Sequence, residues 1–392
     1  MKKKFICILL MGIMLCCNAC QEVDEDTRKN IDMRAEIDEV LANKTYDNIE
    51  ICFDKMANYE GQELIIATVD SKYINEGLSF EESMELYTEE VFPRLLDRED
   101  VNKELLFDAD TCIDEEDNRL RYYEKSYKEI IATIDEYESV PRLVYEDGEN
   151  YTELYYTGNW LTGVYLTQGV LGRYADSMSA FHAYEIIKDE KIYDCRLDSL
   201  TDKYMLMDGE KTVAEAKEEI EKYLDAHYPL TGDENGFKNE VFSITVGKIE
   251  GAEYYAFKAK RTLSYDGIPI REMPFTQDLE NELGFMGEAA LCESNKLDIT
   301  IGLINTFTEP EIERTIQEYI PFAEVMERVS YYLTGETKFQ LVYGGIEYRM
   351  FYADEGYHMV PYWYFIAENP NDDTVLKVYV DIETGEITHF DY

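Results

Sequence analysis

Basic residues are scarce in this chain of 392 residues. Lysine and arginine total 37, against 83 aspartate and glutamate residues, so the formal net charge is −46. A nucleic-acid-binding protein needs basic side chains that displace counterions from the phosphates, and the sequence contains no basic stripe. The composition therefore excludes a general nucleic-acid binder and is typical of an acidic, solvated protein surface.

Proline and glycine are also few, at 9 and 22 residues, while hydrophobic residues make up 45 % of the chain. This composition excludes a disordered or fibrous protein and suffices for one or more packed cores. At about 150 residues per domain, the length predicts two or three domains.

Catalytic motifs are missing. The sequence has no H-E-x-x-H, G-x-S-x-G, S-x-x-K, G-x-G-x-x-G or P-loop pattern. An acidic stretch at 108–117 lacks the glycine of a calcium loop and is predicted to be solvated. No histidine lies at a metal-ligand spacing from another. The four are His182, His227, His358 and His389. We therefore predict no catalytic residue, no metal site and no cofactor.

The N-terminus has the pattern of an export signal. Lys2, Lys3 and Lys4 precede the apolar run Phe5–Leu15. Eleven residues are too few to cross a bilayer, which needs about 20, but match the hydrophobic region of a signal peptide. A polar segment begins at Gln21.

The end of this run, Cys16-Cys17-Asn18-Ala19-Cys20, resembles a bacterial lipobox. The resemblance implies that Cys20 becomes the acylated N-terminus of the mature protein, which would carry palmitate or a similar chain. Cys17 stands where leucine is common, so Cys16 or Cys17 is an alternative lipidation site, and a plain secretory cut after Ala19 is another. The predicted location is the extracytoplasmic face of the cell membrane.

Four cysteines lie beyond this region: Cys52, Cys112, Cys195 and Cys292. They allow two disulfides in three pairings, but a chain of this length folds without them. We expect free thiols, with Cys52 and Cys292 buried because apolar residues flank both.

The hydrophobic pattern predicts an α+β fold in which helices pack on antiparallel sheets, in two or three units of a helix followed by a β-meander. The expected segments are a signal peptide at 1–20, a polar tether and helix at 21–58, and α+β units at 59–200, 201–307 and 308–392.

Capping boxes at Ser79–Glu82 and Thr212–Glu215 each indicate a helix start. Further helices are expected at Asn118–Tyr137, from Thr308–Glu311, and at Pro321–Leu333. The pair Gly344-Gly345, between two alternating strands, predicts a two-residue hairpin turn.

The C-terminal stretch Leu376–Ile387 contains V-Y-V-D-I-E-T-G-E-I and resembles the terminal hairpin of PepSY-type domains. Tyr265–Ile270 resembles the G-x-P-V turn of that class, and Val360–Phe365 resembles its P-x-W strand in related exported proteins. The layout is similar to uncharacterised lipoproteins of clostridia-like Gram-positive bacteria. The resemblance implies a non-catalytic module outside the membrane and carries over no catalytic residue.

Tyrosine is abundant, with 33 residues. A hairpin is predicted from Arg142–Glu146 and Tyr151–Thr157, with its turn at Asp147-Gly148. Aromatic residues follow its second strand up to Trp160, and others follow a C-terminal strand at 357–364. We interpret them as strand formers with half-wet hydroxyls, although an exposed set would hold a sugar or peptide.

The predicted function is thus a membrane-anchored, non-catalytic binding or regulatory lipoprotein with an envelope protein or glycan as partner. The alternative is a lipoprotein that binds or processes extracellular carbohydrate, a class that uses paired carboxylates.

Overall fold

The structure is a computed structural model, and its placed residues cover most of the chain beyond the N-terminus. The described residues are 33–43, 46–73, 77–78, 82, 85–95, 142–146, 150–157, 160–172, 186–227, 236–272, 287–301, 305–334, 338–353, 356–371 and 374–391. The predicted helix at Asn118–Tyr137, the acidic stretch at 108–117, Cys20 and His182 lie outside them.

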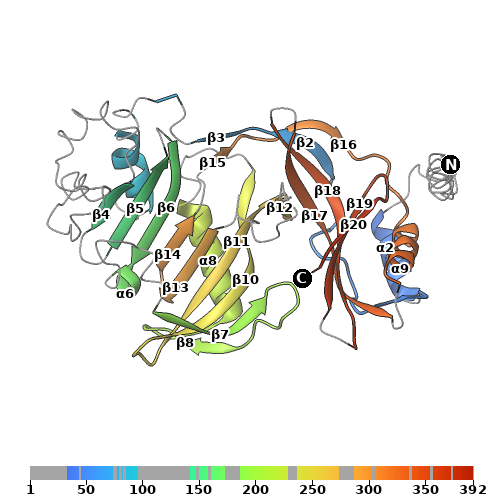
Figure 1. The fold of residues 1–392 in the computed structure, drawn as a ribbon, viewed down its shortest axis with the longest axis horizontal. Coiled ribbons are helices and arrows are strands. Elements are labelled where there is room, and N and C mark those ends of the chain that lie inside the picture. The colour runs from blue at the N-terminus through green and yellow to red at the C-terminus, as the bar shows by residue number, and fades with distance from the viewer. Residues whose placement is uncertain are drawn as a thin grey trace, which may run out of the picture.

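The α+β prediction is wrong. The described residues are mostly β, and strands from every predicted α+β unit pair in one large mixed sheet of 16 strands (Figure 1). Separate units of helix and meander do not form because strands far apart in the sequence pair with one another. β2 lies between β16 and β18, and β12 joins β11 to β17. Hydrophobic alternation identified strands but carried no information about their partners.

The strands in chain order are β1 (Ile49–Ile51), β2 (Ile65–Val69), β3 (Ser71–Tyr73), β4 (Arg142–Glu146), β5 (Asn150–Thr157), β6 (Trp160–Gln168), β7 (Ile187–Asp194), β8 (Lys203–Met205), β9 (Glu210–Thr212), β10 (Phe237–Ile249), β11 (Tyr255–Tyr265), β12 (Ile268–Glu272), β13 (Gly287–Glu293), β14 (Lys296–Ile301), β15 (Asn305–Phe307), β16 (Glu311–Thr315), β17 (Phe339–Ala353), β18 (Gly356–Glu368), β19 (Val375–Asp381) and β20 (Ile387–Asp391). The helical segments are α2 (Met33–Asn43), the π-helical turn η2 (Tyr87–Val91), α4 (Phe92–Leu95), α6 (Gly169–Gly172), α8 (Val213–His227) and α9 (Phe322–Tyr332).

The first hydrophobic core lies between α8 and the strands β7, β10, β11, β13 and β14. Helix α8 turns Val213, Ala216, Ile220 and Leu224 toward the sheet, at the three- and four-residue spacing of one helix face. All four are fully buried. This confirms the amphipathic helix predicted after Thr212.

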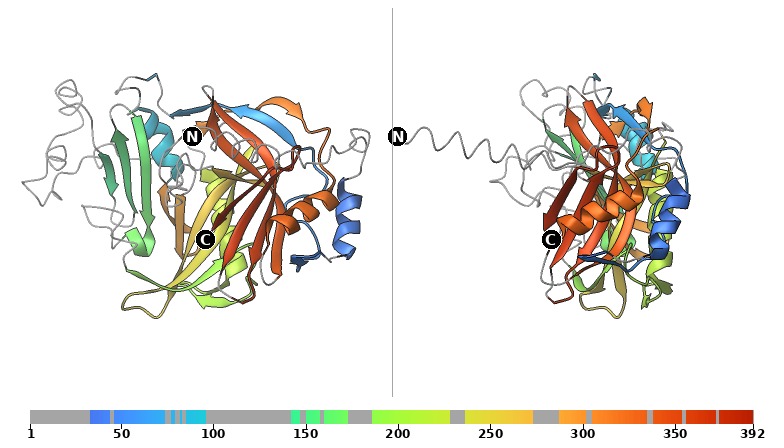
Figure 2. Two further views of the ribbon diagram at one scale, coloured as in Figure 1. Left: turned by 45° about the vertical axis from the view of Figure 1, so that its right-hand side comes forward. Right: turned by 90° about the vertical axis from the view of Figure 1, so that its right-hand side faces the viewer.

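The second core lies between the strands β17, β18 and β19 and helix α9, with α2 beside α9 at the end of the molecule (Figure 2). Phe322 of α9 packs on Trp363 of β18, with ring centroids 5.1 Å apart. Ile37 and Leu41 of α2 are buried in the same core. The predicted helices in 21–58 and at Pro321–Leu333 are therefore present.

Few hydrogen-bonded pairs connect the sheet regions of these two cores. β12 pairs with β11 through Ser264–Pro269 and Tyr265–Ile268, at the Asp266-Gly267 turn. It then runs parallel to β17 over three residues, Ile270–Glu272. The corner at β12 is thus the connection through which the main path of the sheet passes from one core to the other.

The predicted hairpin at Gly344-Gly345 is wrong, because β17 runs straight through both glycines. The hairpin turn lies further along the chain, between β17 and β18, where Ala353 pairs with Gly356. The glycines instead admit a neighbouring segment. A Cβ on Gly344 would overlap the ring of Phe53, and a Cβ on Gly345 would lie 3.0 Å from the carbonyl oxygen of Ala57.

Substitution of Gly344 tests this explanation. Gly344→Ala is expected to lower the free energy of unfolding by about 1–3 kcal/mol, the usual cost of overpacking. The double variant Gly344→Ala/Phe53→Ala should lose less than the sum of the two single losses, since the second change removes the overlapping ring. Urea unfolding of the four proteins measures the coupling, and strictly additive losses would contradict the explanation.

The helix predicted to start at Thr308–Glu311 is also absent. Glu311–Thr315 forms the strand β16, which pairs with β2. Pairing with β2 outweighs the helix-start signal of Pro310, as is common for short segments.

The cysteine predictions are half right. Cys292 is buried and Cys195 half-buried, and both are free thiols. Cys52 is exposed, contrary to prediction. Ile49 and Ile51 point inward, and the alternation of an extended chain turns the following Cys52 outward. Cys112 lies outside the described residues.

Candidate functional site

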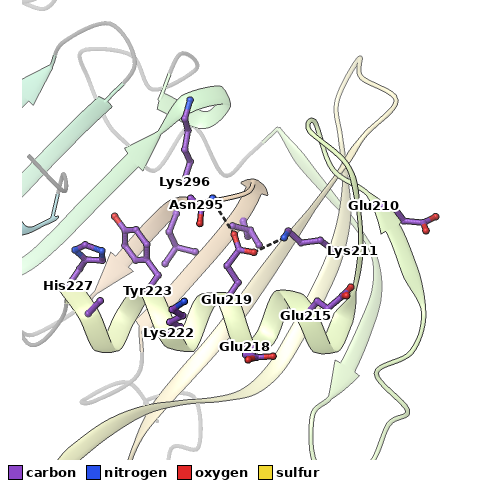
Figure 3. A pocket seen from close by; sticks show the side chains of 13 residues that line it. Glu210, Lys211, Glu215, Glu218, Glu219, Lys222, Tyr223, His227, Asn295 and Lys296 are labelled. Carbon is purple, nitrogen blue, oxygen red and sulfur yellow. Dashed lines mark hydrogen bonds and ion pairs between the residues drawn. The ribbon is translucent and has the colours of Figure 1, made fainter.

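A groove with a volume of about 490 Å³ runs along one flank of α8 (Figure 3). This volume is within the range of small-molecule sites. The hairpin β13–β14 forms the opposite wall with Asn295 and Lys296, and Leu291 and Leu297 line the apolar part. We call this the α8 groove. The helix contributes residues at the spacing of a single helix flank: Glu215, Glu218, Glu219, Lys222, Tyr223, Ala226 and His227.

The predicted capping box fixes the start of this wall. The backbone N–H of Thr212 donates to the Glu215 carboxylate at 2.8 Å, and the N–H of Glu215 donates to the Thr212 hydroxyl at 3.1 Å. The Thr212 backbone N–H and hydroxyl together hold the pKa of Glu215 below its usual value. The box thus places an ionised carboxylate at the N-terminal end of the groove.

Carboxylates gather at that end. Glu219 pairs with Lys211 at 2.6 Å and accepts the backbone N–H of Asn295 at 2.7 Å, which ties helix to hairpin. Glu218 is exposed and has no ion pair with another described residue. With Glu210 and Glu215, this end of the groove carries four acidic side chains and one lysine.

Cations gather toward the C-terminal end of α8. Lys222 is exposed and makes no ion pair within the described part of the chain. Lys296 pairs with Glu293 at 3.3 Å. A Cβ on Gly169 would lie 2.7 Å from Cδ of Lys296, so the absence of a side chain there leaves room for the lysine. In Figure 3, Lys222 lies nearer to Tyr223 and His227 than Glu215 does, and Glu218 points to the side of α8 away from Asn295.

Tyr223 and His227 close the C-terminal end, with their rings in contact at a tilt of 40° and ring centroids 4.2 Å apart. The Tyr223 hydroxyl donates to the carbonyl oxygen of Leu95 at 2.9 Å. Nδ1 of His227 donates to that of Arg94 at 2.8 Å. These two hydrogen bonds connect the end of α4 to α8, so the Tyr223 hydroxyl and Nδ1 of His227 serve the packing of the two helices.

A second polar cluster lies at the junction of the two cores, on the face of β17 away from α9. Glu347 is fully buried, with Nε of Arg271 at 3.4 Å and Nη1 of Arg196 at 3.8 Å from its carboxylate oxygens. Neither carboxylate oxygen has a hydrogen bond. Arg196 also donates hydrogen bonds from Nε and Nη2 to the Asp194 carboxylate of β7, and from Nη1 to the Tyr364 hydroxyl at 3.1 Å. This cluster therefore connects β7, β12, β17 and β18.

The cluster is built for charge compensation. Burial lowers the pKa of Arg271, but the Glu347 carboxylate together with Tyr379 and Tyr364 outweighs burial, and the pKa of Arg271 is raised. Burial, followed by the charge of Glu347, raises the pKa of Tyr343 and keeps its phenol neutral. The pKa of Tyr379 is raised by the same two causes. The buried charges are therefore compensated within the cluster. We assign it a structural role, which is to connect the strands where the two cores meet.

The residues that the sequence singled out are dispersed. His358 faces Glu313 at 3.3 Å, and the side chain of His389 lies outside the description. Within the described residues, no three His, Cys, Asp or Glu side chains come together as metal ligands. Trp363 and Tyr364 are fully buried and pack in the cores, as the structural interpretation expects of them, whereas the aromatic side chains at 151–160 lie outside the described residues.

No described helix is both long and apolar enough to span a bilayer. The α8 groove was not predicted. The sequence does predict the helix after Thr212, whose polar side forms one wall of the groove. It did not predict β13, which leads into the opposite wall, so the two walls could not be brought together.

Comparison with known proteins finds no matching family model and no matching curated protein. Among solved structures, the chain is similar to an uncharacterised protein from Eubacterium rectale. The two share 14 % sequence identity, with 88 % of this chain and 92 % of the other covered and a TM-score of 0.45.

Proposed function

We propose that this chain is a lipid-anchored protein of the extracytoplasmic membrane face that acts as a non-catalytic binding or regulatory module. The observation that carries the proposal is the N-terminal pattern, in which the basic start and apolar run are followed by Ala19-Cys20. Its PepSY-like C-terminal stretch supports the same class. β19 and β20 form the expected hairpin, closed where Asp381 accepts the Thr384 backbone N–H at 2.7 Å.

The α8 groove is the proposed ligand site. Its volume and apolar lining suit a ligand, and Glu218 and Lys222 are its exposed charges without ion pairs among the described residues. Glu215 and Glu219 engage the backbone of the protein itself. The charged side chains that line the groove therefore support the recognition of a charged or polar ligand.

Fatty-acid labelling of the full chain in a Gram-positive host tests the anchor. We expect an alkyne analogue of palmitate to label the protein, which should sediment with membranes. Cys20→Ala should abolish labelling, whereas Cys16→Ala and Cys17→Ala, the matched controls, should retain it. An unlabelled chain with an intact N-terminus in the soluble fraction would overturn the proposal.

Carbohydrate binding is the second candidate, because Tyr223 and His227 rings line a groove that holds carboxylates. Burial of Trp363 and Tyr364 removes the C-terminal sheet aromatics from this argument. A glycan array probed with the mature protein distinguishes the candidates.

A further inference from the structure

The polar cluster around Glu347, at the junction of the two cores, contains buried polar atoms that its hydrogen bonds do not satisfy. Glu347 is fully buried, and neither of its carboxylate oxygens accepts a hydrogen bond from a described residue. Nη1 of Arg271 is also buried and donates to none of the described residues. A carboxylate offers about four acceptor positions, and nearly all buried polar groups in proteins are hydrogen-bonded. These three atoms therefore indicate a further hydrogen-bonding partner.

Arg196 does not provide that partner, because other groups fix its orientation. Its Nε and Nη2 donate to the Asp194 carboxylate. Its Nη1 donates to the Tyr364 hydroxyl at 3.1 Å and lies 3.8 Å from a carboxylate oxygen of Glu347. A charged N–H···O hydrogen bond is about 2.7–2.9 Å long, so this separation leaves an ion pair without a hydrogen bond.

Arg271 is held in a comparable way. Its guanidinium lies over the Phe242 ring, with Cζ 4.6 Å from the ring centroid. Its Nε is 3.4 Å from the second carboxylate oxygen of Glu347, which is also too far for a charged hydrogen bond. The planar guanidinium places Nη1 on the same rigid group, so the unsatisfied donor and the unsatisfied acceptors belong to side chains that face each other.

We propose that this cluster binds ordered water, with at least one molecule bridging a carboxylate oxygen of Glu347 to Nη1 of Arg271. Water both donates and accepts, so one molecule satisfies both groups. With a hydrogen bond of about 2.8 Å on each side, a water connects atoms up to about 5.5 Å apart. The 3.4 Å approach of the two side chains lies well inside that span. The inference depends neither on the lipid anchor nor on the α8 groove.

Tyr364 supplies a third polar contact for the water. Its hydroxyl accepts from Nη1 of Arg196, while its own O–H donates to no residue in the described part of the chain. The hydroxyl and the Glu347 carboxylate thus face the same arginine nitrogen. Buried waters make about three hydrogen bonds each, and Glu347, Arg271 and Tyr364 supply that number.

The charges around the site favour water over an ion. A cation would be repelled by the guanidinium groups of Arg196 and Arg271, and an anion would be repelled by the Glu347 carboxylate. Water carries no charge and gains from both signs. The junction between the cores is therefore a hydrated contact, in which water completes the hydrogen bonding of a buried ion pair.

A high-resolution crystal structure of the mature chain tests the proposal directly. We expect a water about 2.5–3.0 Å from a carboxylate oxygen of Glu347 and about 2.7–3.2 Å from Nη1 of Arg271. Direct hydrogen bonds from the arginines to Glu347, with no water beside them, would overturn the proposal. An ion or a buffer molecule in the place of the water would overturn it as well.

Oxygen-17 relaxation dispersion provides the test in solution, because it counts waters that stay bound for longer than the protein takes to tumble. Glu347→Leu/Arg271→Met replaces both groups by apolar side chains and should lose at least one such water per molecule. Ile346→Val is the matched control, since this neighbouring side chain lies in the core beneath α9, and should keep the wild-type count.

An equal count in wild type and the double variant would contradict the assignment of water to this cluster. Circular dichroism shows whether both variants fold. The crystal structure of the unchanged chain decides the question by itself if the double variant does not fold.

Discussion

Glu347→Ala is expected to lower the free energy of unfolding by about 3–5 kcal/mol. The substitution removes the carboxylate that lies 3.4 Å from Arg271 and 3.8 Å from Arg196. Arg271 would then remain buried beside a second arginine without its carboxylate partner. Loss of one partner of a buried ion pair costs far more than the pair contributes net, because the remaining charge stays desolvated.

A paired replacement provides the control for this prediction. Glu347→Leu/Arg271→Met removes both charges and should recover most of the stability lost by Glu347→Ala, since apolar residues of similar volume replace a buried pair at little cost. Urea unfolding measures all three proteins. A loss below about 1 kcal/mol for Glu347→Ala, typical of exposed pairs, would contradict the role assigned to the cluster.

Asp298→Asn is expected to change the pH dependence of stability. Asp298 is 1 % exposed, and one carboxylate oxygen accepts the Gln168 backbone N–H at 2.8 Å while the other has no partner. Burial raises the pKa of this carboxyl well above its usual value, against the smaller opposite effect of the Gln168 hydrogen bond. Since the folded state holds the proton more tightly, the stabilisation is full below about pH 4 and is lost as the pH rises through the folded-state pKa.

The variant cannot ionise and retains an oxygen that accepts the Gln168 N–H. Wild-type stability from this group should fall by up to about 1.4 kcal/mol per pH unit above pH 4, and Asp298→Asn should remove that slope. The variant should therefore be the more stable protein at neutral pH. Urea midpoints from pH 4 to 9 measure the difference, with the exposed Asp266→Asn as control. Parallel pH profiles for wild type and Asp298→Asn would refute the prediction.

Local structure was predictable from the sequence where neighbouring residues determine it. The Thr212–Glu215 capping box, the turn within Tyr265–Ile270 and helix α9 are all present as expected. In each case the structure is determined locally, by a side chain that hydrogen-bonds to the neighbouring backbone or by a residue type that favours a turn. The β4–β5 hairpin follows the same rule, since its strands are separated by three residues.

Long-range pairing was not predictable from the sequence. Gly344 has the pattern of a turn, and only the arrival of Phe53 from 291 positions earlier explains it. Glu311–Thr315 became a strand because β2 was available as a neighbour. The α8 groove needs a helix flank and the β13–β14 hairpin together, and hydrophobic periodicity describes each element alone.

The pairing of β1 and β2 bears on when the protein can fold. Ile49 lies beside Phe339, and Ala67 lies beside Met359. These partners are separated by about three quarters of the chain, so the second core closes only after nearly all residues have left the ribosome. Contacts of such high sequence separation form slowly, and until then the apolar strands stay unpaired. The first core needs no partner from that end of the chain, since its buried residues all precede Gly302, so the two cores differ in how early in synthesis their parts are complete.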